Sequence, residues 1–172
     1  MSAPNTPAKM LLRSLAALTY DLLILPAILL LAGAVAVFPA QWLLPELTFD
    51  HGPARWLLQA WLAGSAFLFL GHSWTRAGQT IGMRAWRIRL VDAQGHNPGW
   101  TQAALRFATG LVLLLAALSA GQMAHASLGS AWAGVITGLL VVLPAWLLLL
   151  VPPHRSLQDR LSGTHLVYLP KR

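Results

Sequence analysis

Cysteine is absent from this chain of 172 residues, and charged side chains are scarce. Without cysteine the protein has no disulfide, no thiolate metal site and no cysteine nucleophile. Charged residues make up 10% of the chain, against about 25% in a typical soluble domain, whereas hydrophobic residues make up 56%. These proportions predict one compact domain that lies in a membrane.

Acidic residues are the scarcest charged group, with five against twelve lysines and arginines, which gives a formal net charge of +7. In a soluble protein such an excess would suggest nucleic-acid binding. Here the basic residues lie beside apolar segments, so we expect the lipid bilayer as partner and no nucleic acid.

Four apolar runs are long enough to cross a hydrocarbon core of about 30 Å, which needs roughly 20 helical residues. The first run is Leu11–Phe38, with a span at about 14–38, and the others lie at about 57–74, 103–124 and 131–151. Residues 1–8 are polar and contain two prolines, so we expect a disordered lead before a single domain of residues 9–172.

An alternative interpretation of the first run is a cleaved signal peptide, because Ala34-Val35-Ala36 fits a small-residue cleavage pattern. The apolar run is longer than a usual signal core, and it contains a carboxylate, which would weaken targeting. We therefore favour a retained membrane helix.

The basic residues predict the orientation, because short cytoplasmic loops of membrane proteins are rich in lysine and arginine. With four spans, eleven of the twelve basic residues fall on one side, and Arg55 alone falls on the other. We therefore expect a multi-pass protein of the cell (inner) membrane with both termini in the cytoplasm.

Asp21 lies inside the first span, where an aspartate costs about 2.5–3.5 kcal/mol unless it finds a partner. Arg13 is eight positions earlier, about 12 Å along the helix, which is too far for a direct pair. We expect Arg106, at the inner start of the third span, as the partner, with Arg84 or Arg87 as alternatives. Such a cluster fits either a ligand or ion site or a structural ion pair.

The loop between the second and third spans is too regular for a simple connection. Arginine and apolar residues alternate over Arg87–Leu90, which predicts a short strand, and Ala93–Gly95 would turn it. Residues 164–169 (THLVYL) predict a second strand that pairs with the first. The expected fold is an all-α membrane protein with four transmembrane helices and a small cytoplasmic β/helical cap.

The segment before the second predicted strand is typical of a short helix. Ser156 and Asp159 have the spacing of a capping box, the helix is expected to continue to about Leu161, and Gly163 is placed to end it. Capping alone would be a sufficient role for Asp159.

Gly78, Thr80, Gly82 and Arg84 belong to a loop motif, GQTIGMR, that resembles an anion-binding glycine loop. It lacks the Gly-Lys-Ser/Thr of a nucleotide P-loop, so we expect no nucleotide and no other cofactor.

Taken together, the stretches LLRSLAALTYDLLI, GQTIGMRAWRIRLVDAQG, ALRF and RSLQDRLSGTHLV resemble the RDD family of small integral membrane proteins, which is named for one arginine and two aspartates. The similarity covers residues 13–167. It implies that Arg13 and Asp21 are the first two signature residues and that Asp159 is the second aspartate, with Asp92 as the alternative.

The resemblance also implies membrane transport as one activity of the family. The family's loop often reads Gly-Gln-Thr-Pro-Gly-Lys-Arg, and Ile81 and Met83 of this chain depart from it. The departure puts any role for a loop lysine in doubt. The alternative function is a membrane scaffold or accessory subunit whose ion pairs serve assembly.

The remaining motifs predict packing rather than chemistry. Gly134 and Gly138 form a GxxxG element, which fits close helix packing within the bundle or, as the alternative, contact with a second copy or a membrane partner. The histidines lack metal-ligand spacing, so we expect no metal. No GxSxG or HExxH motif is present, and we expect no enzymatic activity.

Overall fold

Long helices dominate the computed structural model, which describes residues 6–44 and 46–170. The long helices are α1 (Pro7–Leu43), α2 (Gly52–Ala77), α4 (Trp100–Leu128) and α5 (Ala131–Leu147), and α5 continues into a 3-10 turn, η1 (Leu148–Leu150). The short elements are α3 (Ile81–Ala85), β1 (Ile88–Asp92), α6 (Leu157–Ser162) and β2 (Thr164–Tyr168).

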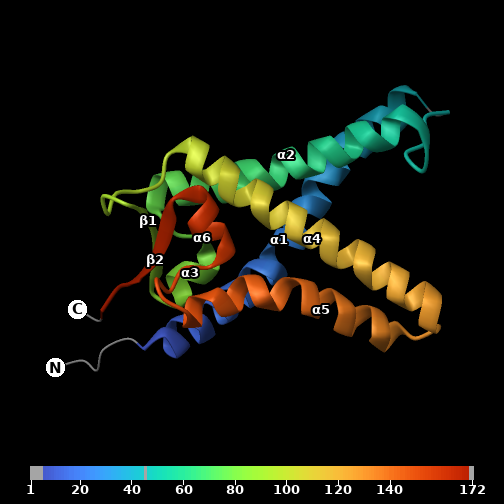
Figure 1. The fold of residues 1–172 in the computed structure, drawn as a ribbon. Coiled ribbons are helices and arrows are strands. Elements are labelled where there is room, and N and C mark those ends of the chain that lie inside the picture. The colour runs from blue at the N-terminus through green and yellow to red at the C-terminus, as the bar shows by residue number, and fades with distance from the viewer. Residues whose placement is uncertain (1–5, 45, 171–172) are drawn as a thin grey trace.

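Two helical hairpins form the body of the molecule, α1 with α2 and α4 with α5 (Figure 1). The hairpins meet where α2 packs against α4 and where α1 touches η1. The four short elements gather at one end of the hairpins, and we call them the cap. Both ends of the described chain lie on the cap side (Figure 1).

Helix α1 is longer than the predicted span of residues 14–38. It begins at Pro7, which suits the first helical turn because its missing N–H would be unpaired there anyway. At 1.5 Å per residue its 37 residues extend about 55 Å, more than a hydrocarbon core needs. The prediction of a disordered lead is therefore wrong for Pro7 and Ala8, and residues 1–5 lie outside the described residues.

Within the described residues, three helical segments are long and apolar enough to cross a membrane: Pro7–Leu43, Trp100–Leu128 and Ala131–Leu150. Helix α2 contains 26 residues but is less apolar, with Gln59 and His72 among its leucines and phenylalanines. The predicted span at 57–74 is therefore a helix, while its crossing of the bilayer stays a prediction.

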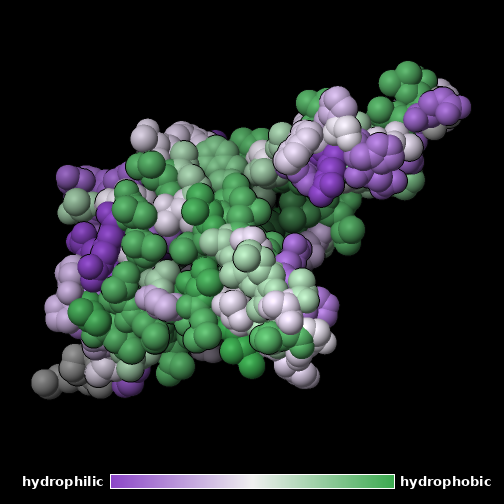
Figure 2. Space-filling model, turned by 45° about the vertical axis from the view of Figure 1, so that its right-hand side comes forward, coloured by the Kyte–Doolittle hydropathy of each residue, from purple (hydrophilic) through white to green (hydrophobic). Residues whose placement is uncertain are grey.

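Apolar side chains cover the outside of the long helices. Leu23 is 73% exposed, and Leu30, Val112 and Leu140 are also largely exposed. A broad hydrophobic band crosses the visible face, with hydrophilic residues at the cap and at the far tip (Figure 2). Exposed apolar surface of this extent requires lipid around it.

The cap contains the predicted two-stranded sheet. Strands β1 and β2 pair in antiparallel register, with Ile88 opposite Tyr168 and Asp92 opposite Thr164. The turn after β1 has Gly95 at a positive φ of 83°, a conformation that glycine adopts without strain. Both strands and the turn that residues 93–95 predict are confirmed.

The core of the molecule lies where the cap meets the helices. Ile88 and Leu90 of β1 are fully buried, and Trp74 of α2, Met83 of α3 and Ala103 of α4 join them. The alternation of arginine and apolar residues along β1 thus directs its apolar face onto the helix ends.

The hairpin of α4 and α5 depends on small residues. A Cβ added at Gly134 would lie 2.8 Å from the Gly121 carbonyl oxygen, and one at Gly138 would lie 3.2 Å from the Ala117 oxygen. The GxxxG element therefore packs against α4 of the same chain, while contact with a second copy stays a prediction.

Candidate functional site: a cavity between the hairpins and the cap

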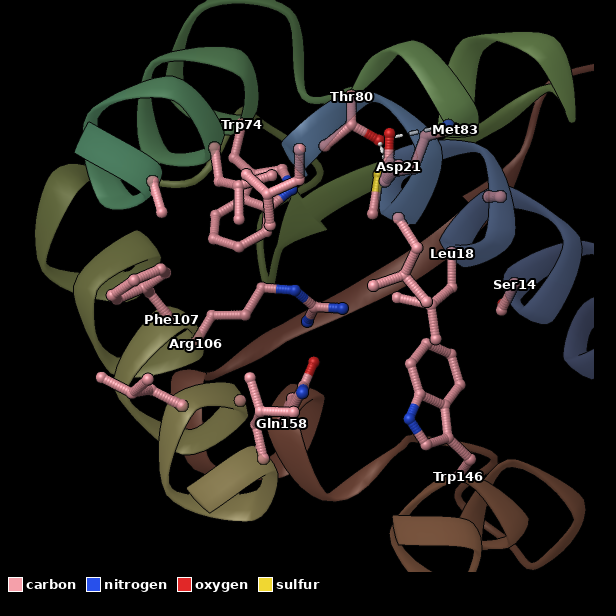
Figure 3. Close-up of a pocket in the computed structure, with 18 of the residues that line it drawn as sticks. Ser14, Leu18, Asp21, Trp74, Thr80, Met83, Arg106, Phe107, Trp146 and Gln158 are labelled. Carbon is pink, nitrogen blue, oxygen red and sulfur yellow. Dashed lines mark hydrogen bonds between the residues drawn. The ribbon is translucent and has the colours of Figure 1, made fainter. Parts of the chain in front are cut away.

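A cavity of about 390 Å³ lies where the two hairpins and the cap meet. About half of its lining is leucine and alanine from α1, α2 and α4. Polar or polar-tipped side chains line it as well: Ser14, Asp21, Trp74, Thr80, Arg106, Trp146 and Gln158 (Figure 3). The site is therefore an apolar chamber with several hydrogen-bonding groups.

Asp21 is held by the first turn of α3. Its Oδ2 accepts a hydrogen bond from the Thr80 hydroxyl at 2.5 Å, and its Oδ1 accepts one from the Gly82 backbone N–H at 2.9 Å (Figure 3). Thr80 is also the N-cap of α3, because its hydroxyl accepts a hydrogen bond from the Met83 N–H. One carboxylate thus joins α1 to the loop motif.

The expected pairing of Asp21 with Arg106, or with Arg84 or Arg87, is wrong. The carboxylate finds its partners at Thr80 and Gly82, since a helix start offers unpaired N–H groups that a carboxylate can satisfy. Arg84 and Arg87 are exposed. A lone carboxylate in a membrane helix suggests a positively charged partner, whereas neutral donors compensate Asp21 here.

Arg106 forms the buried ion pair of the described chain. This side chain of α4 is only 3% exposed, and its Nη1 donates to Oδ1 of the fully buried Asp159 and, at 3.1 Å, to the Thr164 hydroxyl. The guanidinium also lies 5.7 Å from the centre of the Trp74 ring. The pair connects α4 to α6 and β2.

Asp159 has a second role, which the sequence predicts correctly. Its Oδ2 accepts a hydrogen bond from the Ser156 N–H at 3.0 Å, and its own N–H donates to the Ser156 hydroxyl. This capping box starts α6, and the helix ends at Gly163, whose φ is 66°. Asp92, the alternative aspartate, instead accepts hydrogen bonds in the turn after β1.

Arg13 does not line the cavity with Asp21 and Arg106. Its guanidinium carbon lies 3.9 Å from the centre of the Tyr168 ring, so it connects α1 to β2 by a cation–π contact. Arg13 thus contacts Tyr168, Asp21 binds Thr80 and Gly82, and Arg106 pairs with Asp159, so the four expected residues all join the cap to the long helices.

The loop motif also serves these attachments. Gly78 ends α2 with a φ of 67°, and its carbonyl accepts a hydrogen bond from the Leu90 N–H at 2.7 Å. A Cβ at Gly82 would lie 2.1 Å from the Ala17 carbonyl oxygen, so α3 approaches α1 as closely as only glycine allows.

Sequence reasoning missed three polar residues of this region: Trp74, Gln158 and Thr164. The indole nitrogen of Trp74 is buried with no hydrogen-bond partner among the described residues. Gln158 points its amide into the cavity from α6 (Figure 3). Two of them could have been noticed in the sequence, because Gln158 is next to Asp159 and Thr164 begins the predicted last strand. Both lie on the cap side of the molecule, where the basic residues are concentrated.

The part of the chain that the structure describes contains no group of three or more histidine or acidic side chains suited to a metal ion. A comparison with curated proteins and one with solved structures gave no match. The family model of the RDD family matches residues 7–163, which is most of the chain and includes every residue of the cavity except Leu166. This multi-pass membrane protein therefore belongs to the RDD family.

Proposed function

We propose that this RDD protein transports a small molecule or ion across the membrane and that the cavity between the hairpins and the cap is its binding site. The observation that carries the proposal is the position of Asp21 and Arg106, which line opposite walls of one apolar cavity at its cap end (Figure 3). Polar groups inside a membrane bundle typically mark substrate or ion pathways.

The proposal includes four membrane spans, with α2 as the fourth, and both termini in the cytoplasm. An even number of spans agrees with the position of both described chain ends on the cap side (Figure 1). The cap side also carries most of the basic residues, as the cytoplasmic side of a membrane protein does. The location would be the cell (inner) membrane.

In this proposal Asp21 is the residue that responds to the ligand or ion, because it is half-buried and lines the cavity. Arg106 and Asp159 would hold the cap over the cavity mouth. No chemical reaction is assigned to the site, and the protein is proposed to act without enzymatic activity, cofactor or metal.

The test uses Asp21→Asn, which keeps the shape of the side chain and removes its charge. Purified protein is reconstituted into vesicles, and fluxes of protons and alkali cations are followed with enclosed dyes. The proposal expects a flux in the wild type that falls at least about tenfold in the variant, while expression and melting temperature stay close to the wild type. Absence of a wild-type flux, or an equal flux in both proteins, would contradict it.

A second candidate function, a membrane scaffold or accessory subunit, is favoured by one specific observation. Both oxygens of Asp21 and both oxygens of Asp159 already accept hydrogen bonds within the chain, as structural attachments do. This function predicts a partner that co-purifies with the protein and becomes less abundant when the protein is deleted. A wild-type flux without such a partner would exclude it.

A further inference from the structure

Unused hydrogen-bond donors gather at the polar end of the cavity. Arg106 donates only from Nη1 to the described residues, which leaves Nε and Nη2 without a partner in that part of the chain. The buried indole N–H of Trp74 is likewise unpartnered among the described residues. Of these donors the Trp74 N–H is the buried one, and a buried donor without an acceptor typically costs about 1–3 kcal/mol, so an acceptor for this N–H would stabilise the protein.

Gln158 is the third residue that adds an unused donor to this set. Its amide nitrogen lies against Gly110, 3.0 Å from where a Cβ of that residue would be, and the amide forms no hydrogen bond with the described residues. Arg106 and Gln158 both project toward the centre of the cavity, from α4 and α6 (Figure 3). The cavity therefore presents donors from three elements to one small volume.

Asp21, the acceptor on the opposite wall, does not satisfy these donors. Its two oxygens are occupied by the Thr80 hydroxyl and the Gly82 N–H. The charge of Arg106 is already balanced by Asp159, so the net charge around the cavity is that of Asp21. A negatively charged head group would be repelled by this uncompensated carboxylate, and a positively charged one would be repelled by Arg106 and could not accept hydrogen bonds from the donors.

The rest of the cavity is suited to an alkyl chain. Leu29 on α1 and Leu114 on α4 each lie eight residues beyond the polar end, about 12 Å along their helices. Leu22 and Leu114 line the cavity and are 57% and 52% exposed, so the cavity reaches the apolar outer surface between α1 and α4. A lipid can therefore enter sideways from the bilayer. The volume is at the small end of the range for ligand sites, which favours one chain over two.

We infer that the cavity binds an uncharged single-chain lipid whose head group carries ester, carbonyl or hydroxyl oxygens, with the head at Trp74, Arg106 and Gln158 and the chain along the leucines of α1 and α4. This inference rests on the proposed function only in taking the cavity as a binding site. It does not require transport.

The test compares four probes with the same chain length: monopalmitoylglycerol, palmitate, hexadecylammonium and hexadecane. Full-length protein is released from detergent micelles in a native mass spectrometer, and bound probe is counted as its concentration rises. Monopalmitoylglycerol should bind one per chain and at least about tenfold more tightly than the other three. Equal binding of hexadecane, or tighter binding of palmitate or hexadecylammonium, would overturn the inference.

Two sets of variants locate the site. Trp74→Phe combined with Gln158→Leu removes two donors and keeps the ring beside Arg106, so monopalmitoylglycerol binding should weaken about tenfold or more. Ala63→Leu fills the cavity and leaves the donors in place, and it should weaken binding as strongly. Trp132→Phe is the matched control, because Trp132 is 76% exposed and lies outside the cavity. If the Trp74→Phe/Gln158→Leu variant and the Ala63→Leu variant both bind monopalmitoylglycerol as tightly as the wild type, the inference is overturned.

The two proposals fail in different ways. An Asp21-dependent ion flux without monopalmitoylglycerol binding would leave the proposed function standing and remove this inference. Monopalmitoylglycerol binding that depends on Trp74 and Gln158, together with no ion flux in the wild type, would leave this inference standing and remove the proposed function.

Discussion

Asp21 and Asp159 have the same role from opposite sides, because the carboxylate of Asp21 joins α1 to the cap and the carboxylate of Asp159 joins the cap helix α6 to α4. Asp21 receives neutral donors from the start of α3, and Asp159 receives the guanidinium of Arg106. The two residues therefore differ in what their removal leaves behind. Loss of Asp159 leaves a buried positive charge, whereas loss of Asp21 leaves unpaired neutral donors.

Asp159→Asn should destabilise the protein strongly. A buried charge that loses its partner typically costs about 3–5 kcal/mol, and Arg106 is only 3% exposed. The measurement is the melting temperature of detergent-solubilised protein, followed by size-exclusion chromatography after heating. Arg106→Leu combined with Asp159→Leu should be more stable than Asp159→Asn, since it removes both charges.

The matched control for this prediction is Asp92→Asn, in the turn after β1. Asp92 accepts hydrogen bonds from two backbone N–H groups close to the protein surface, so its replacement should have a smaller effect. An equal loss of melting temperature in both variants would show that the buried pair does not stabilise the fold.

Asp21→Ala should loosen α3 without unfolding the helices. The Gly82 N–H and the Thr80 hydroxyl lose their acceptor, at a cost of about 1–3 kcal/mol for a partly buried group. Hydrogen exchange of peptides over residues 80–86 should become faster, while exchange in α5 should stay unchanged. Thr19→Val is the control, because the Thr19 hydroxyl donates to the Leu15 carbonyl of its own helix. Exchange over residues 80–86 in Asp21→Ala that is as slow as in the wild type would contradict the prediction.

At the scale of the elements, close backbone approach decides how helices pack. Three glycines lie where a neighbouring backbone carbonyl is too close for a Cβ atom. Gly82 contacts α1 in this way, and Gly121 and Gly134 bring α4 and α5 together. In a bilayer lipid tails are as apolar as leucine, so fit rather than hydrophobic burial holds helices together. Alanine at these positions must separate the elements.

Gly134→Ala should therefore lower the melting temperature more than Gly138→Ala. A Cβ at Gly134 would lie 2.8 Å from a backbone oxygen, whereas one at Gly138 would lie 3.2 Å from another. Gly64→Ala is the matched control, because nothing lies within 4 Å of its Cβ and alanine favours a helix by about 0.5–1 kcal/mol. Equal melting temperatures for Gly134→Ala and Gly64→Ala would contradict the packing of α4 on α5.

At the scale of the whole molecule, the cap closes one end of the two hairpins, and the cavity lies beneath it. The cap is attached to the helices by the Arg13 contact with Tyr168, by Asp21 and by the pair of Arg106 and Asp159. Three attachments from α1 and α4 hold β2, α3 and α6 in place. The arginine and the two aspartates that the family resemblance singled out thus act between the cap and the helices.

The proposed orientation, with both termini in the cytoplasm, can be tested with reporters. A reporter fused after Arg172 should be active in the cytoplasm, because eleven of the twelve basic residues then lie on that side. A second reporter inserted near Asp50 should be active only outside. A cytoplasmic signal from the Asp50 insertion would show that α2 does not cross the bilayer, and an external signal after Arg172 would reverse the topology.

The sequence by itself determined the membrane class, the helical segments, the two strands and the capping box of α6. Each depends on residues close in the chain: apolar length, alternation along β1, and the spacing of Ser156 and Asp159. Local periodicity is sufficient for such features.

Only the tertiary structure decided which groups meet. Asp21 lies 59 residues from Thr80, and Arg106 lies 53 residues from Asp159. A charged residue in a membrane helix predicts that a partner is present. Helix packing decides whether that partner is an arginine or a pair of neutral donors. Likewise, only the structure shows that the donors of Trp74 and Gln158 lack partners and line the same cavity. Whether a donor finds an acceptor depends on the packing of α2 and α6 and not on either helix alone.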